Sequence, residues 1–182
     1  MKHSFSLEID DSLSLVQPTL EMAHDLFEVV DSDRDHLRKY LDFVDSSTSF
    51  ESQEQYIKMK LEGYVNGTDR LFLIAFDQKI IGCIDLHFID TDHKKAELGY
   101  WLHSSQTNKG IMTKVVKNVC AIAFENMNLN KLSIRADTEN MASNTVAVKN
   151  GFSFVGTDKS EILMYDEFRD LNKYSLLKAD FN

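Results

Sequence analysis

Three strand-like runs follow one another between residues 70 and 103, and this arrangement constrains the fold more than any other part of the sequence. The runs are RLFLIAF (70–76), KIIGCIDLHFI (79–89) and KKAELGYWLH (94–103). Asp77-Gln78 joins the first two, and residues 90–93 join the last two. Because connections this short join neighbouring antiparallel strands, the sequence predicts an antiparallel meander in the middle of the chain.

The segments before the meander are mainly helical in pattern. Residues 5–16 alternate loosely in polarity and predict an opening strand. Helical patterns follow, after the break at Pro18-Thr19, at 20–30, 31–40 and 51–65. Thr48 and Glu51 have the spacing of a capping box, and Asn66-Gly67 is a natural stop for the third helix.

Helix and strand patterns alternate after the meander. The expected elements are a helix at 108–126, a strand at 131–137, a helix at 142–150, a strand at 152–156, a turn at 166–170 and a closing strand. Ile111, Val115, Val119, Ile122 and Ala123 share one face of the first helix. A run of strands followed by alternation predicts an α+β fold, with a mixed, mainly antiparallel sheet that is locally parallel and flanked by helices.

Composition limits the number of domains and the location of the protein. The 182 residues, 43% of them hydrophobic, are enough for one large core, and no linker-like segment divides them. We therefore expect a single domain over residues 1–182. No segment approaches the ~20 apolar residues of a membrane span, and the amino terminus turns acidic before any apolar run. These features predict a cytoplasmic protein without membrane contact.

Charge and the reactive side chains exclude several functions. The net charge of −9 disfavours direct nucleic-acid binding and fits a cationic partner, or simply a solubilising surface. The six histidines form no ligand pair on a helix, so no metal is expected. The glycines form neither a P-loop nor a dinucleotide motif. Cys83 and Cys120 lie in apolar runs and are expected to be buried free thiols without a catalytic role.

The stretch ELGYWLHSSQTNKGIMTKVV (97–116) leads from a strand through a short polar loop and a glycine into a helix. Such a junction points unpaired backbone N–H groups at one spot, where the helix dipole adds about half a positive charge. Gly110 lets the backbone approach an anion closely, while Lys109 and Thr113 offer a charge and a hydroxyl donor. The pattern is typical of a diphosphate site, although many such loops only cap a helix.

Two motifs here resemble the acetyl-CoA motifs of the GNAT superfamily. ELGYWL (97–102) with NKGIMT (108–113) is similar to the first, and Asn140, Ser143 and Asn144 with Gly151-Phe152 are similar to the second. Within the superfamily, GYWL, KGIMT and ASN-x-VA are most similar to the bacterial ribosomal-protein-serine acetyltransferases. The resemblance covers nearly the whole chain and implies a GNAT-like sheet with one splayed parallel pair.

The resemblance also implies acetyl-CoA as the co-substrate. The expected binding residues are Tyr100, Trp101, Leu102, Thr107, Asn108, Lys109, Gly110, Ile111, Met112, Thr113, Asn140, Ser143 and Asn144. In the family, the strand corresponding to Tyr100–Leu102 splays from its neighbour and binds the pantetheine arm. The chain departs from the family pattern at Thr107, where Gln or Arg is usual, and at Met112, where Gly or Ala is usual.

Two side chains correspond to catalytic residues of the family. Ser143 stands where relatives place the proton donor to the thiolate, and Glu161 matches the glutamate that removes the amine proton through water. Without the resemblance, Asn140 and Ser143 would be interpreted as an N-cap and a first-turn residue of a helix, and Glu161 as a solvated carboxylate.

The expected acceptor is the amino-terminal α-amine of a protein, for example of a ribosomal protein. Family analogy also implies a homodimer. An α-amine titrates at about 7.7 to 8.0 and a lysine at about 10.4, so the α-amine offers roughly 400-fold more neutral nucleophile at pH 7. Two alternatives remain open. One is an acetyltransferase for a small amine such as a polyamine or an antibiotic, and the other is a non-catalytic acyl-CoA-binding module.

Overall fold

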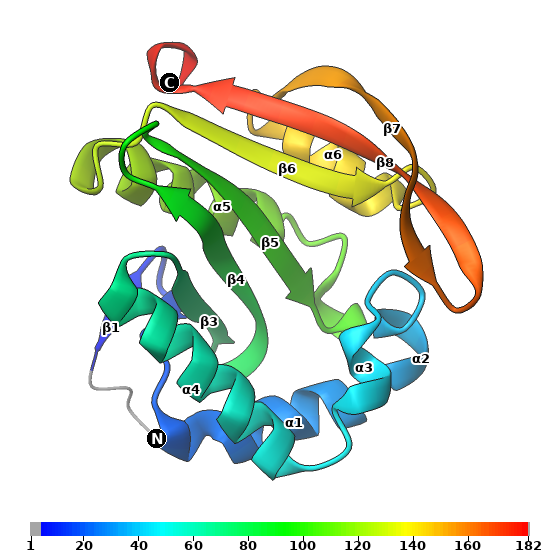
Figure 1. The fold of residues 1–182 in the computed structure, drawn as a ribbon. Helices are drawn as coiled ribbons and strands as arrows, with labels where there is room; N and C mark the ends of the chain where they lie inside the picture. Colours follow the sequence, from blue (N-terminus) through cyan, green and yellow to red (C-terminus); the bar gives the residue numbers. More distant parts are fainter. Residues whose placement is uncertain (1–4, 182) are drawn as a thin grey trace. The chain divides into compact units, whose positions relative to one another are not determined.

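The computed structural model describes residues 5–181, which belong to two compact units. The first unit comprises Met1–Asp85 and Tyr100–Val115, and the second comprises Leu86–Gly99 and Val116–Asn182. Within the described residues the sheet has eight strands in the order β1-β2-β3-β4-β5-β6-β8-β7 (Figure 1). One pair, β5 with β6, is parallel, which confirms the predicted mixed and mainly antiparallel sheet.

The first unit opens with two short strands where the sequence predicts one. β1 (Ser6–Glu8) pairs antiparallel with β2 (Leu13–Val16), which in turn pairs antiparallel with β3 (Arg70–Phe76). Asp10 causes the break, because its Oδ1 accepts the backbone N–H groups of Ser12 at 3.2 Å and Leu13 at 3.0 Å. The prediction of a single strand over residues 5–16 is therefore wrong.

Helices occupy the segment between β2 and β3. They are η1 (Leu20–Met22), α1 (Ala23–Asp31), α2 (Arg34–Leu37), α3 (Phe43–Ser46) and α4 (Phe50–Asn66). The helix predicted at 31–40 is only four residues long, and Arg34 at its start turns back to donate to the carbonyls of Val44 and Ser47. α1 packs against α4, and α4 packs on β3.

α4 confirms the predicted third helix, but its capping box lies one residue later than expected. Ser49 and Ser52 form the box in place of Thr48 and Glu51. The helix ends at Gly67, whose φ of 75° places it in the left-handed region, as a C-terminal glycine requires. The apolar faces of α1, α4 and β3 enclose the buried core of this unit, which includes Leu26, Ile57 and Leu73.

The predicted meander is present as β3, β4 (Lys79–Asp90) and β5 (Lys95–Leu102). Asp77 and Gln78, which join β3 to β4, have φ values of 47° and 65°, as expected for a tight hairpin turn. Gly82 allows the close approach of the strands in the first unit. A Cβ there would lie 2.3 Å from the carbonyl oxygen of Trp101.

The second unit contains the alternating elements. They are the end of α5 (Ile111–Ala121), a π-helical turn (Ile122–Asn126), β6 (Lys131–Asp137), α6 (Met141–Lys149), β7 (Ser153–Met164), β8 (Glu167–Leu177) and η4 (Lys178–Asp180). β8 lies between β6 and β7 and is antiparallel to both (Figure 1). α6 packs against β6 and β7.

β7 is longer than predicted and carries Glu161 within the strand. The register steps from Asp158 opposite Leu171 to Ile162 opposite Arg169, so the intervening residues of β7 bulge. Asp170 supports the bulge by accepting from Ser160 N–H at 2.9 Å and from Lys159 Nζ at 2.6 Å. The turn predicted at 166–170 is instead at Tyr165-Asp166, where both residues have positive φ.

The parallel pairing of β5 with β6 stops halfway along β5. The register runs from Lys95 opposite Lys131 to Leu98 opposite Ile134, and β5 continues to Leu102. β6 is paired with β8 over its whole length. Within residues 5–181, no helix is both long and apolar enough to span a membrane.

Candidate functional site

In the first unit, the loop before α5 contains two residues with a left-handed backbone. Asn108 and Gly110 have φ values of 60° and 74°, so the helix starts at Ile111 and not at Asn108. Its first ladder bond runs from Lys114 N–H to the Gly110 carbonyl at 3.2 Å. The amides of Ile111, Met112 and Thr113 therefore precede the intrahelical ladder.

Gly110 itself faces open space. Among the described residues, no atom outside its chain neighbours lies within 4 Å of the position that a Cβ would take. Gly110 and its neighbours Asn108 and Lys109 are exposed. An anion can therefore approach the backbone here, at the positive end of the helix dipole.

The side chains of this loop mainly bind one another. Thr107 Oγ1 donates to the Ser104 carbonyl at 2.8 Å, and Lys109 Nζ donates to Gln106 Oε1 at 3.0 Å. Thr107 thus stabilises the loop from within, where the family usually has a longer polar side chain. Lys109 itself is exposed and directly precedes Gly110.

The end of β5 contributes packing as well as backbone. The Trp101 ring lies 6.2 Å from the Phe43 ring and packs against two buried clusters of the first unit. Leu102 is buried, and Tyr100 is half-buried. The Trp101 side chain therefore packs in the core of the first unit.

In the second unit, Asn140 caps α6. Its Oδ1 accepts the N–H of Ser143 at 3.1 Å, so the bond expected of a helix N-cap is present. Ser143 lies in the first turn of α6 and is half-buried. The structure thus brings Asn140 and Ser143 together, with the Ser143 amide committed to the cap.

The Asn144 side chain makes every hydrogen bond available to an amide. Its Nδ2 donates to the carbonyls of Asp137 at 2.8 Å and Asn140 at 2.7 Å. Its Oδ1 accepts from Tyr174 Oη at 2.7 Å and Asn172 Nδ2 at 2.8 Å. Asn144 is buried and ties α6 to β6 and β8, a positioning role that the motif alone does not reveal.

Glu161 lies in a charged network that sequence reasoning missed. Arg135 Nη1 donates to Glu161 Oε1 at 3.0 Å, and Arg135 Nε donates to Glu97 Oε1 at 2.8 Å. His87 Nε2 lies 3.4 Å from the same Glu97 oxygen. Burial alone would raise the pKa of Glu97, but hydrogen bonds from His87 and Arg135 outweigh it and hold that pKa below its usual range.

One feature of the sequence could have identified Arg135 as a member of this network. On β6 it alternates with buried Leu132, Ile134 and Ala136, so its side chain points to the opposite face of the sheet. An arginine in the middle of a central strand needs an acidic partner. The sequence does not show which carboxylates meet it, because the partners lie 38 and 26 residues away along the chain.

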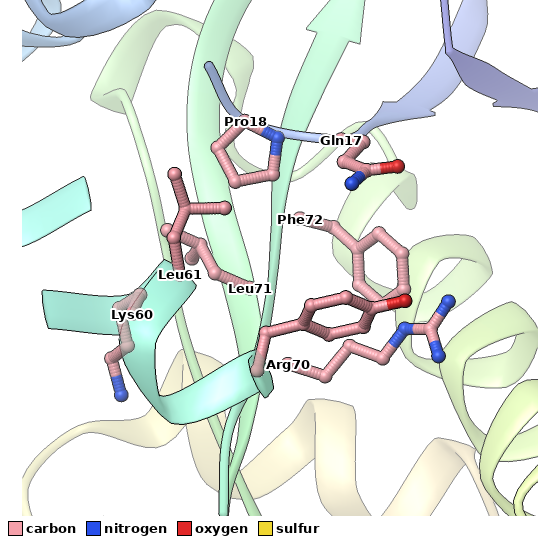
Figure 2. Close-up of a pocket in the computed structure, with 8 residues that line it drawn as sticks. Gln17, Pro18, Lys60, Leu61, Arg70, Leu71 and Phe72 are labelled. Atoms are coloured by element: carbon pink, nitrogen blue, oxygen red, sulfur yellow. The ribbon is translucent and has the colours of Figure 1, made fainter. Parts of the chain in front are cut away.

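Other groups of interest lie apart from the predicted residues. The small pocket in Figure 2 is lined by Gln17, Pro18, Lys60, Leu61, Tyr64, Arg70, Leu71 and Phe72, none of which is a predicted site residue. No group of three potential metal ligands occurs among residues 5–181. Cys83 and Cys120 are buried free thiols, as predicted. Burial raises the pKa of both, that of Cys120 to about 12, which makes them poor nucleophiles.

Comparison with known proteins identifies the family of this chain. The model of the acetyltransferase (GNAT) domain matches residues 12–153. YdaF of Bacillus subtilis, whose name describes a ribosomal N-acetyltransferase, is 27% identical to this chain over 180 residues. The match covers 97% of each chain. The ribosomal-protein-serine acetyltransferase of Escherichia coli is 24% identical over 170 residues, which cover 93% of this chain and 95% of that protein.

A solved structure shows the same fold. A ribosomal L7/L12 α-N-protein acetyltransferase (RimL) in complex with coenzyme A matches with a TM-score of 0.91. It is 22% identical, and the match covers 95% of this chain and 98% of that one.

Proposed function

This chain belongs to the GNAT acetyltransferase family and is an N-acetyltransferase, and from that premise we propose that it acetylates the amino-terminal α-amine of a protein. Acetyl-CoA is the proposed acetyl donor, and a ribosomal protein is the proposed acceptor. The observation that carries the acceptor is the similarity, over 93% of this chain, to an enzyme named for a ribosomal-protein serine.

The residues before α5 fit the diphosphate of acetyl-CoA. Gly110 combines a left-handed backbone with open space, and the amides of Ile111, Met112 and Thr113 precede the helical ladder. Lys109 adds a positive charge at the same place. We propose that Thr107–Thr113 bind the diphosphate and that the backbone of Tyr100–Leu102 binds the pantetheine arm.

Acetyl-CoA would supply an activated acetyl thioester, so the chain has to supply proton transfer and orientation. We propose that the Ser143 hydroxyl donates a proton to the thiolate, with Asn140 holding the first turn of α6 in place. The sequence predicts Asn144 as a cofactor ligand. Its side chain makes four hydrogen bonds within the protein, and we therefore propose a positioning role for it.

Glu161 is the proposed base. Its side chain is 36% exposed, so water can reach the carboxylate and relay a proton from the amine. The ion pair with Arg135 keeps Glu161 in one place on the bulge of β7. A base that acts through one water suits an α-amine better than a lysine, because a larger fraction of the α-amine is already neutral near pH 7.

Further parts of the proposal come from the sequence and from family analogy. Length and composition favour a single domain and a cytoplasmic location without membrane contact, and the net charge of −9 disfavours direct nucleic-acid binding. The spacing of the histidines favours the absence of a metal, and family analogy implies a homodimer.

The proposal can be tested by incubating the protein with acetyl-CoA and a library of amino-terminal peptides beside polyamines and aminoglycosides. Mass spectrometry then reads which acceptors gain an acetyl group. We expect acetylated peptides, with the label on the α-amine. Acetylation of small amines alone would support the first alternative, and cofactor binding without any product would support the non-catalytic module.

A further inference from the structure

We infer that Asp33 is a positioning residue that holds the loop before α5 in the conformation that binds the cofactor. This inference rests on the proposed acetyl-CoA site. Asp33 lies in the turn between α1 and α2, within the run DSDRDHLRK, and 71 residues separate it from the loop. Neither the motifs nor the family resemblance assigns it a role.

Both oxygens of the Asp33 carboxylate accept hydrogen bonds from Ser104. Oδ2 accepts the backbone N–H of Ser104 at 2.6 Å, and Oδ1 accepts its hydroxyl at 2.7 Å. The Asp33 side chain is only 9% exposed. Because a buried carboxylate is costly unless it is hydrogen-bonded, a loop conformation that breaks these two bonds is disfavoured.

Ser104 in turn forms two hydrogen bonds with Thr107, further along the loop. Its carbonyl accepts the N–H of Thr107 at 3.1 Å and the Thr107 hydroxyl at 2.8 Å. Asn108 directly follows Thr107, and Gly110 comes two residues later; both have positive φ values before α5 begins. Asp33 is thus connected, through two residues, to the backbone that the diphosphate would approach.

The neighbouring charged residues of the run DSDRDHLRK make other contacts or are exposed. Asp31 pairs with Arg34 at 2.7 Å, and Arg34 binds the carbonyls of Val44 and Ser47. Asp35 is exposed on α2. Asp33 is therefore the acidic residue of the run that is directed at the loop, so the run does not simply form a solvated acidic face.

Positioning and charge predict opposite effects on cofactor affinity. If Asp33 acts only through its negative charge, neutralising it should strengthen the binding of an anionic diphosphate. If Asp33 positions the loop, removing its side chain should weaken binding, and asparagine should restore most of it. Asparagine can accept the Ser104 N–H with Oδ1 and donate Nδ2 to the Ser104 hydroxyl oxygen.

The test is calorimetric titration with coenzyme A of the wild type, Asp33→Ala, Asp33→Asn and the control Asp35→Ala. We expect Asp33→Ala to weaken binding about 10-fold, as a lost hydrogen bond to a charged group would. Asp33→Asn should stay within about 3-fold of the wild type, and Asp35→Ala should be unchanged. Amide hydrogen exchange of residues 104–110 without ligand should rise in Asp33→Ala only.

Each other outcome is informative. Equal affinity of the wild type and Asp33→Ala, or tighter binding by both Asp33 variants, would overturn the inference while leaving the proposed function intact. Absence of binding by the folded wild type would contradict the proposed acetyl-CoA site and the inference with it. If Asp33→Ala does not fold, Ser104→Ala, which removes the hydroxyl contact alone, should still weaken binding by about 3-fold, and unchanged affinity there would also overturn the inference.

Discussion

Nη1 of Arg135 lies 3.0 Å from Oε1 of Glu161, so the proposed base is held by a cation on β6. The same guanidinium donates from Nε to Glu97 on β5 at 2.8 Å. One arginine in the second unit therefore fixes two carboxylates. A carboxylate held in this way keeps a fixed orientation, which a water-relayed base requires.

Glu161→Gln should lower turnover by about 10²-fold while cofactor affinity stays within a few-fold, as expected for a positioned base. Glutamine can still accept a hydrogen bond from Arg135 but cannot take a proton at neutral pH. Steady-state kinetics provide the measurement, with Glu167→Gln as the matched control, since Glu167 pairs with Arg169 and is 72% exposed. Wild-type turnover in Glu161→Gln would remove the residue from the mechanism.

Glu97→Gln should lower the free energy of unfolding at neutral pH by about 2 kcal/mol, because it removes an ionic hydrogen bond from a half-buried site. The pKa of Glu97 is lowered in the folded state, so its contribution is present above the unfolded value of about 4.3 and is lost as pH falls through the lower folded pKa. Urea denaturation should show the two proteins converging as the pH falls below the unfolded pKa of about 4.3 and through the lower folded pKa. A difference that stays constant into strong acid would refute the ion-pair explanation.

Ser143→Ala should lower turnover by about 10²-fold and leave the cap of α6 intact, because the cap bond from Asn140 uses the Ser143 backbone N–H and not its hydroxyl. Asn140→Ala should instead lower the free energy of unfolding by about 1 kcal/mol through loss of the cap. Thermal denaturation and single-turnover kinetics on both variants distinguish catalysis from capping. Normal turnover in a fully folded Ser143→Ala would assign Ser143 a structural role alone.

Gly110→Glu should abolish the binding of acetyl-CoA, since it places bulk and negative charge where the diphosphate would approach the backbone. Gly67→Glu is a close control. Gly67 has a φ of 75° beside 74° at Gly110, and no atom of the described residues outside its chain neighbours lies within 4 Å of its Cβ position either. Both variants should lose stability through backbone strain, but only Gly110→Glu should lose calorimetric binding. Equal affinity in the two would place the diphosphate elsewhere.

Local patterns predicted most of the fold because the relevant interactions are local. The meander follows from short connections such as Asp77-Gln78, and the end of α4 follows from Gly67. The opening hairpin was missed because one residue, Asp10, ends β1 by accepting backbone N–H groups within an otherwise strand-like run. The length of β7 was missed because its bulge depends on Asp170 in the partner strand.

The candidate site was predictable where it is continuous in sequence. The loop from Thr107 to Gly110 and the N-cap Asn140 were located from short motifs. The contacts of Arg135 with Glu97 and Glu161, and of Asp33 with Ser104, join segments that only the sheet order and the helix packing bring together. No local pattern encodes these pairs, since each joins elements that are distant in sequence.

The most direct test of the proposed function is a competition for acetyl-CoA among three acceptors at equal concentration. They are a serine-initiated peptide, a lysine-containing peptide with a blocked amino terminus, and spermidine, with each product followed by mass over time. We predict that the serine-initiated peptide is acetylated on its α-amine well ahead of the others, in line with its greater neutral fraction near pH 7. Dominant acetyl-spermidine, or equal labelling of the blocked peptide, would contradict the assignment to protein amino termini.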